Sequence, residues 1–174
     1  MERITKLDGA RRHLDQAIRL FFEDRDPLVV HTLAAAAQGT LRDIARVNDS
    51  QFKSILHDHP DIPDDHRKDW VNALNAPRNF FKHADRDPQG VLEFDPSVNI
   101  STLLDAVLLC GSLSNEYLSA ANVFMGWFTT KFPEMRNSIS NNQIGEFAVH
   151  NGISPDDKAK FLELIDARIL IGRA

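Results

Sequence analysis

The stretch DPLVVHTLAAAAQGTLRDIARV, residues 26–47, carries the clearest structural pattern of this chain. Asp26 followed by Pro27 has the form of a helix N-cap and first helical residue. Apolar side chains then recur at helical spacing, at Val30, Leu33, Ala34, Ala37, Leu41 and Ile44. The alanine run at 34–37 allows a neighbouring helix to approach closely. The stretch therefore predicts an amphipathic helix that ends near Val47.

The segment before it, residues 3–24, shows the same periodicity, with Ile4, Leu7, Leu14, Ala17, Ile18, Phe21 and Phe22 on one face. The connection from Glu23 to Asp26 is long enough only for a tight turn. Two helices joined in this way pack as an antiparallel hairpin. We therefore expect the chain to begin with a helical hairpin.

The longest apolar pattern runs from about residue 97 to residue 131 and predicts a long central helix, with Gly111 or Asn115 as the points where it bends. The hairpin is expected to pack on this helix. Farther along, 144–149 predicts a short helix, and Ser154-Pro155-Asp156-Asp157 is a start signal for a final helix.

The region between the hairpin and the long helix is less regular. Residues 49–58 are compatible with a short helix, which the two prolines of His59-Pro60-Asp61-Ile62-Pro63 must interrupt. A helix is expected to restart at Asp64 or Asp65 and to carry Trp70, Val71 and Leu74 inward, and Pro77 then either breaks it or begins a new helical turn. Residues 85–96 predict two turns around a short strand at 91–94.

The composition is that of one all-α domain spanning residues 1–174, a single-domain helical bundle without a linker. The only cysteine, Cys110, cannot form an intramolecular disulfide, and its leucine neighbours predict a buried thiol. No run approaches the roughly 18 apolar residues of a membrane span, and residues 1–6 lack the apolar part of a signal peptide. We therefore expect a cytoplasmic protein that does not enter a membrane.

The formal charge of −5 argues against a protein that coats nucleic acid through a broad basic face. A local basic cleft, especially one formed by two subunits, remains compatible with this charge.

The segment Arg78-Asn79-Phe80-Phe81-Lys82-His83 is the first candidate for chemistry. If Pro77 occupies the first helical position, Arg78 and Asn79 lie in the first turn, where free amides and the helix dipole favour an anion such as phosphate. Asn79 and His83 share a helix face, whereas Arg78 lies about 140° from His83 and needs its long side chain to converge. A symmetric dimer satisfies this geometry more easily than one chain.

This segment resembles the Arg-x4-6-His motif of the HEPN superfamily, whose members are compact helical bundles that often act as metal-independent ribonucleases, toxins of toxin-antitoxin systems or antiphage effectors. The resemblance covers six residues. It implies that Arg78 holds the phosphate, that His83 acts as general acid or base, and that Asn79 orients the site, at a cleft between two subunits of a homodimer. The resemblance implies RNA as the partner and calls for neither a cofactor nor a metal.

A non-enzymatic alternative fits the same residues. In it, Arg78 pairs with an acidic side chain, His83 caps a helix end, and the protein is an interaction or ligand-binding helical module, with a protein partner. A second match to the motif, from Arg25 to His31, straddles the start of a helix, and the first match is therefore favoured.

Three further groups of residues have the side chains needed for chemistry. The cluster from His57 to Asp61, with Asp64, Asp65 and His66, contains metal-binding types without metal-site spacing, and it is expected to be a solvated loop. His31 is expected to be a hydrogen-bonded core histidine. The aromatic residues Trp70, Phe80, Phe81, Phe124, Trp127 and Phe128 are expected in the core. The apolar surplus of the long helix favours a symmetric homodimer.

Overall fold

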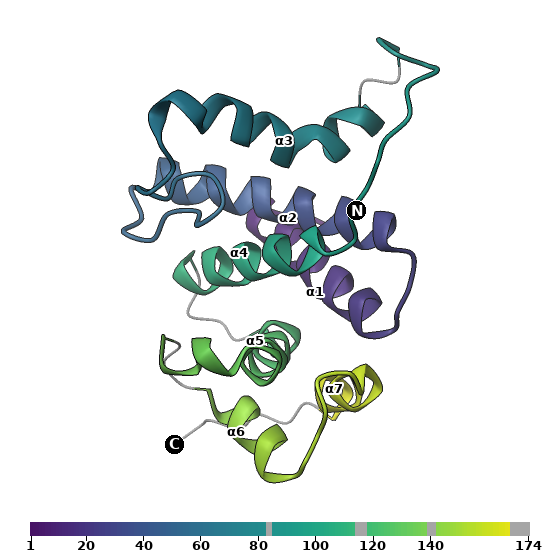
Figure 1. Cartoon of the computed structure of the whole chain (residues 1–174), viewed down its shortest axis with the longest axis vertical. Coiled ribbons are helices and arrows are strands. Elements are labelled where there is room, and N and C mark those ends of the chain that lie inside the picture. The colour runs from purple at the N-terminus through teal and green to yellow at the C-terminus, as the bar shows by residue number, and fades with distance from the viewer. Residues whose placement is uncertain (83–84, 114–117, 139–141, 168–174) are drawn as a thin grey trace.

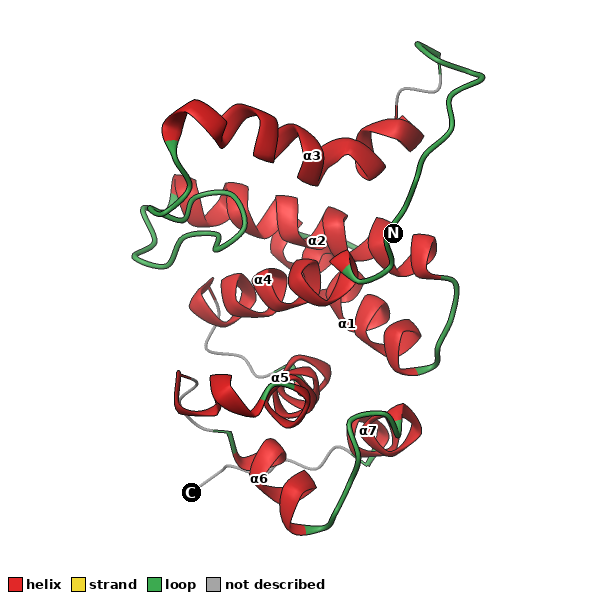
Figure 2. Cartoon of the chain, in the orientation of Figure 1, coloured by secondary structure: helices red, strands yellow, loops and turns green. Residues whose placement is uncertain are grey.

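The computed structural model of the chain describes residues 1–82, 85–113, 118–138 and 142–167. Within these ranges there is no strand (Figure 2). The elements are α1 (Lys6–Phe22), α2 (Pro27–Val47), α3 (Asp64–Lys82), α4 (Val98–Leu113), α5 (Ser119–Lys131), the 3-10 helix η1 (Pro133–Ser138), α6 (Gln143–His150) and α7 (Lys158–Asp166). The prediction of an all-α helical bundle is confirmed.

The predicted hairpin is formed by α1 and α2, and both helices begin at caps that the sequence encodes. The Thr5 hydroxyl accepts from the backbone N–H of Asp8 at 3.1 Å, and the Asp8 carboxylate accepts from the Thr5 N–H at 3.0 Å. Asp26 caps α2 by accepting from the N–H of Leu28 at 2.8 Å. These local bonds satisfy amides that a helix start leaves free, so they fix where each helix begins.

The helices are stacked along the long axis of the molecule (Figure 1). The central helix α2 packs against both α1 and α4, and α5 packs against α6 and α7 on the other side of this layer. The largest buried side chains lie in α1, α2, α4, α5 and α7: Leu14, Ile18, Phe22, Leu41, Leu103, Leu109, Phe124, Trp127 and Phe161. By contrast, α3 lies at the opposite end of the stack, beyond α2.

The predicted long helix at 97–131 is two helices, α4 and α5. Leu118, directly before α5, has φ −98° and ψ 107°, which is extended backbone and ends any continuous helix. The apolar pattern continues through the interruption because both helices are covered by neighbours. Leu103 and Leu109 of α4 and Phe124 and Trp127 of α5 are all buried within one chain. The apolar surplus that favoured a dimer is therefore internal.

Helix α3 differs from the prediction at two points. Pro77 lies inside the helix and neither breaks it nor begins a new one. The side chains expected to point inward are not buried, since Trp70 is 45% exposed and Val71 and Leu74 are only half-buried. Phe80 and Phe81 are exposed as well, whereas Phe124, Trp127 and Phe128 are buried as predicted. Helix α3 thus lies on the bundle without contributing to its core.

The 48–63 segment between α2 and α3 is an irregular loop, so the short helix considered at 49–58 is not formed. Likewise, 91–94 has no strand conformation. The short helix predicted near 144–149 is confirmed as α6, and the final helix begins at Lys158, after a turn at 155–156. Cys110 is buried as expected, and burial raises the pKa of its thiol.

Candidate functional site

The predicted motif lies at the C-terminal end of α3. Arg78 and Asn79 occupy its last two turns with exposed side chains, and His83 lies outside the described residues. Because α3 begins at Asp64, the motif is far from the free amides of a helix start, and the expected contribution of the helix dipole is wrong here. The negative end of the dipole faces this region instead. An anion at this place must be held by side chains.

The Arg78 side chain reaches back across the surface of α2. Its Nη1 atom lies 2.8 Å from the point where a Cβ atom on Gly39 would stand, so the glycine provides the space that the guanidinium occupies. Within the described parts of the chain, no carboxylate lies at ion-pair distance from Arg78. The acidic partner required by the structural alternative is therefore not found among these residues.

Arg78 lines a small pocket of about 20 Å³ between α2, α3, α4 and the loop after α2. The volume accommodates about one oxygen-sized group. The polar residues of its wall come from four separate parts of the sequence: His31, Gln38, His57, Asn75, Arg78 and Thr102. Two imidazoles and a guanidinium thus meet at one place, an arrangement that no single segment of the sequence predicted.

His31 is hydrogen-bonded through one ring nitrogen only. The side chain is 4% exposed, and its Nδ1 lies 3.0 Å from Oδ1 of Asn99. Asn99 donates its own Nδ2 to the Pro27 carbonyl at 2.9 Å, which fixes the orientation of the amide. Its Oδ1 therefore accepts a hydrogen bond from the Nδ1–H of His31, and in the neutral ring Nε2 carries a lone pair. Within the described structure this Nε2 is buried without a partner.

His57 is held in the opposite tautomer. Its Nδ1 lies 3.1 Å from Nε2 of Gln38, which is an amide donor, so Nδ1 accepts and the ring proton is on Nε2. The side chain is 6% exposed. Burial, followed by the charge of Arg42, lowers the pKa of His57, and burial alone lowers that of His31. The expectation of a solvated loop is wrong for His57, because the loop folds back onto α2 and α4.

Asp105 organises this corner of the molecule. Its carboxylate is fully buried and accepts from Nε2 of Gln38 at 2.7 Å, the Ser54 hydroxyl at 2.7 Å and the Ile55 N–H at 2.8 Å. Neither Asp105 nor Gln38 was singled out from the sequence. The available signal was a lone carboxylate within the apolar run Leu103 to Leu109, since such a group is buried only with partners.

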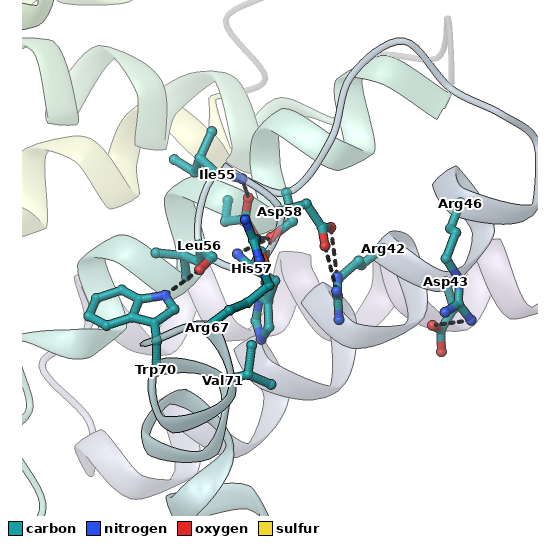
Figure 3. A network of polar contacts seen from close by, with 12 residues as sticks. Arg42, Asp43, Arg46, Ile55, Leu56, His57, Asp58, Arg67, Trp70 and Val71 are labelled. Carbon is teal, nitrogen blue, oxygen red and sulfur yellow. Dashed lines mark hydrogen bonds and ion pairs between the residues drawn. The ribbon is translucent and has the colours of Figure 1, made fainter. Parts of the chain in front are cut away.

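The loop is also held from outside (Figure 3). Arg42 of α2 donates to Asp58 through two nitrogens, at 2.6 and 2.8 Å. From α3, Trp70 donates its indole N–H to the Leu56 carbonyl at 2.6 Å, and Arg67 donates to the carbonyl of His57 at 3.2 Å. These bonds attach the N-terminal half of α3 to the loop that carries His57.

The other candidates of the sequence do not form sites. Asp58 is half-buried in its pair with Arg42, whereas His59, Asp61, Asp64, Asp65 and His66 are exposed, and no group of three metal-ligating side chains gathers in the described ranges. Arg25 pairs with Glu23 at 3.0 Å, while His31 is directed to the interior, so the second motif match does not act as one unit.

The chain was compared with family models, with curated proteins and with solved structures, and no match was found. None of the described helices is both long and apolar enough to span a bilayer.

Proposed function

We propose that this protein binds RNA through its phosphate groups and cleaves it without a metal ion. In this proposal Arg78 holds the phosphate, His83 acts as general acid or base, and Asn79 orients the substrate, as the resemblance to HEPN proteins implies. One observation carries the proposal. Arg78 is exposed, it has no carboxylate partner in the described structure, and it lines a pocket with two imidazoles. A cation in this state is available to an anionic ligand.

The proposed reaction is a transfer within the substrate. A base removes the proton of a ribose 2'-hydroxyl, the oxygen attacks the adjacent phosphorus, and the bond from phosphorus to the 5'-oxygen breaks. The leaving oxygen takes a proton from an acid, giving a 2',3'-cyclic phosphate and a free 5'-hydroxyl. An imidazole near its ordinary pKa performs either proton transfer at neutral pH, and a guanidinium stabilises the charge on the phosphate.

A second copy of the chain is part of this proposal. Phe80 and Phe81, 36% and 49% exposed, stand next to Arg78 and Asn79 and contact each other edge to face with ring centroids 5.3 Å apart. An apolar surface beside the candidate cleft is suited to a symmetric contact that brings two motifs together.

Cleavage of a fluorescent single-stranded RNA in the presence of EDTA tests the function. His83→Ala should abolish the activity, Arg78→Ala should reduce it severely, and Arg78→Lys should restore little, because lysine lacks the planar fork that grips phosphate. His66→Ala, an exposed histidine at the start of α3, is the matched control and should cut as wild type does. Wild-type protein that cuts no RNA, or an active His83→Ala variant, would overturn the proposal.

The alternative is a non-enzymatic interaction module. It is favoured by the exposed aromatic side chains Trp70, Phe80 and Phe81 on a helix that has no buried residue. Exposed aromatic residues are frequent at the centres of protein interfaces. If the wild-type protein cuts no RNA, this reading replaces the first.

A further inference from the structure

We propose that the pocket between α2, α3 and α4 is a binding site for a ribonucleotide phosphate together with its adjacent hydroxyl. Arg78 and His57 donate hydrogen bonds to the phosphate, and His31 accepts one from the hydroxyl. The inference shares Arg78 with the proposed function and rests on it for the biological role, but it adds two histidines that do not belong to the motif.

The donors follow from the network behind the pocket. Gln38 donates to Nδ1 of His57 and to Asp105, and the Ser54 hydroxyl also donates to Asp105. These hydrogen bonds occupy Nδ1 of His57 and do not use its Nε2–H. The ring proton is therefore on Nε2, which can donate to a ligand in the pocket. Arg78 contributes a guanidinium whose charge no described carboxylate neutralises. Two convergent donors, one of them charged, match an oxyanion.

The acceptor is Nε2 of His31. This atom is buried and has no partner, on a side chain that lines the pocket and is 4% exposed. Asn99 fixes the proton on Nδ1, so Nε2 presents a lone pair, which an anion without an O–H group would not satisfy. A buried acceptor needs a donor, and a hydroxyl supplies one. A site with two donors for an oxyanion and one acceptor for a hydroxyl matches a ribose phosphate better than a simple anion.

The pocket holds about one oxygen-sized group in the present conformation, so a nucleotide requires the C-terminal half of α3 to move outward. The structure permits this movement. The bonds of Arg67 and Trp70 to the loop all lie in the N-terminal half of α3, no α3 side chain is buried, and Pro77 lacks the N–H that would continue the helix ladder. Asn75 and Arg78 cover the pocket from the part beyond these anchors.

The test is NMR of the histidine side chains of the full chain during titration with uridine 3'-monophosphate, which has a phosphate beside a 2'-hydroxyl and cannot be cleaved. The imidazole signals of His31 and His57 should shift with one saturation curve, while those of the exposed His13 and His66 stay in place. Arg78→Ala should weaken binding by about tenfold or more, the effect of one lost charge-assisted hydrogen bond. Unmoved His31 and His57 signals at saturating probe, or unchanged binding by Arg78→Ala, would overturn the proposal.

The role of His31 has a separate control. 2'-Deoxyuridine 3'-monophosphate lacks the hydroxyl and should bind wild type more weakly than the ribonucleotide does, whereas a His31→Met variant should bind both probes equally. Equal binding of the two probes by wild type contradicts the hydroxyl contact, and inorganic phosphate binding as tightly as the nucleotide reduces the site to one for free phosphate. The probe is not cleaved, so its binding is independent of catalysis. If the protein binds the probe but cuts no RNA, only the proposed function is wrong. If RNA cleavage depends on His83 but the His31 and His57 signals do not shift with the probe, only the present inference is wrong.

Discussion

At the scale of single residues, Asp105 decides how the loop after α2 lies. Its buried carboxylate is the shared acceptor of three donors, two from the loop and one from α2. The loop has no helix of its own, so these bonds replace the regular ladder that would otherwise satisfy its polar groups. Asp105 thus fixes the position of His57 from the interior, while Arg42 and α3 hold the same loop from outside.

Asp105→Ala should accordingly lower the free energy of unfolding by about 2 to 4 kcal/mol, because it leaves buried donors without an acceptor. Urea unfolding followed by circular dichroism measures the change. Asp43→Ala is the matched control: its pair with Arg46 spans 3.5 Å between side chains more than two-thirds exposed, so it should change stability by less than about 0.5 kcal/mol. If Asp105→Ala leaves the free energy of unfolding unchanged, the loop is held mainly by Arg42 and α3.

The two buried histidines predict how stability depends on pH. Burial lowers the pKa of His31 and of His57 below their usual 6.5, so just below this pH the unfolded chain binds more protons than the folded one. Stability should be constant above about pH 7 and fall as the pH drops from 6.5 toward 5. The groups that face His57 are Arg42, Asp58, Asp105 and Arg78. His31 contacts the uncharged Asn99 and Phe94 and shares its pocket with His57 and Arg78.

Urea midpoints at pH 7.5 and pH 5.5 measure this dependence. His31→Gln should show a smaller fall between the two values than wild type, whereas His13→Gln, an exposed change on α1, should retain the full fall. Carboxylates that titrate below this range do not contribute to the difference. An identical fall in the His31→Gln variant would show that His31 is not buried in its neutral form.

At the scale of elements, the sequence predicts a helix well where its own residues decide it. Asp26 and Pro27 place the start of α2, and the turn at 23–26 makes the hairpin unavoidable. Prediction from the sequence fails where contacts with other helices determine the local structure. Pro77 lies inside α3 although it lacks the N–H that continues the helix ladder. The apolar pattern at 97–131 hides the break before α5, because both α4 and α5 are buried by their neighbours. The sequence singled out Arg78, His31 and His57 separately, but their meeting in one pocket was not predicted, because it depends on tertiary folding.

The contact between α5 and α6 depends on a glycine. A Cβ atom on Gly126 would stand 2.5 Å from Cγ2 of Ile144 and 2.9 Å from the backbone nitrogen of Gly145, distances that real contacts do not allow. Gly126→Ala should therefore force the two helices apart and destabilise the protein by about 1 to 3 kcal/mol.

Gly111→Ala is the natural comparison, because nothing lies within 4 Å of a Cβ atom at that position of α4. Alanine has the higher helix propensity, so this change should stabilise the chain by up to about 1 kcal/mol. Thermal unfolding of both variants distinguishes them by opposite signs. A loss of stability in both would mean that α4 is also packed closely at Gly111.

At the scale of the whole molecule, the two sides of the α1, α2 and α4 layer are unlike. The side toward α5 and α7 is filled with large apolar side chains, among them Phe22, Phe124 and Trp127, which contact one another through their rings. Helix α3 lies on the other side of this layer (Figure 1). That side holds the polar network and the pocket, and α3 has no buried residue. Apolar packing thus dominates one side of the layer, and buried polar contacts dominate the other.

We expect the proposed second subunit to bind beside the candidate site. Helices α4 and α5 bury their large apolar side chains within the chain, whereas Phe80 and Phe81 of α3 are exposed beside the candidate site. If the proposed active site is composite, light scattering at micromolar concentration should give twice the mass of one chain. Phe80→Glu with Phe81→Glu should give a folded monomer without cleavage activity, since neither side chain belongs to the core. A matched pair of exposed apolar changes away from α3, Val47→Glu with Val149→Glu, should leave the dimer intact. A monomeric wild type that still cuts RNA would show that one chain holds the complete site, with the histidines of the pocket in place of the partner's.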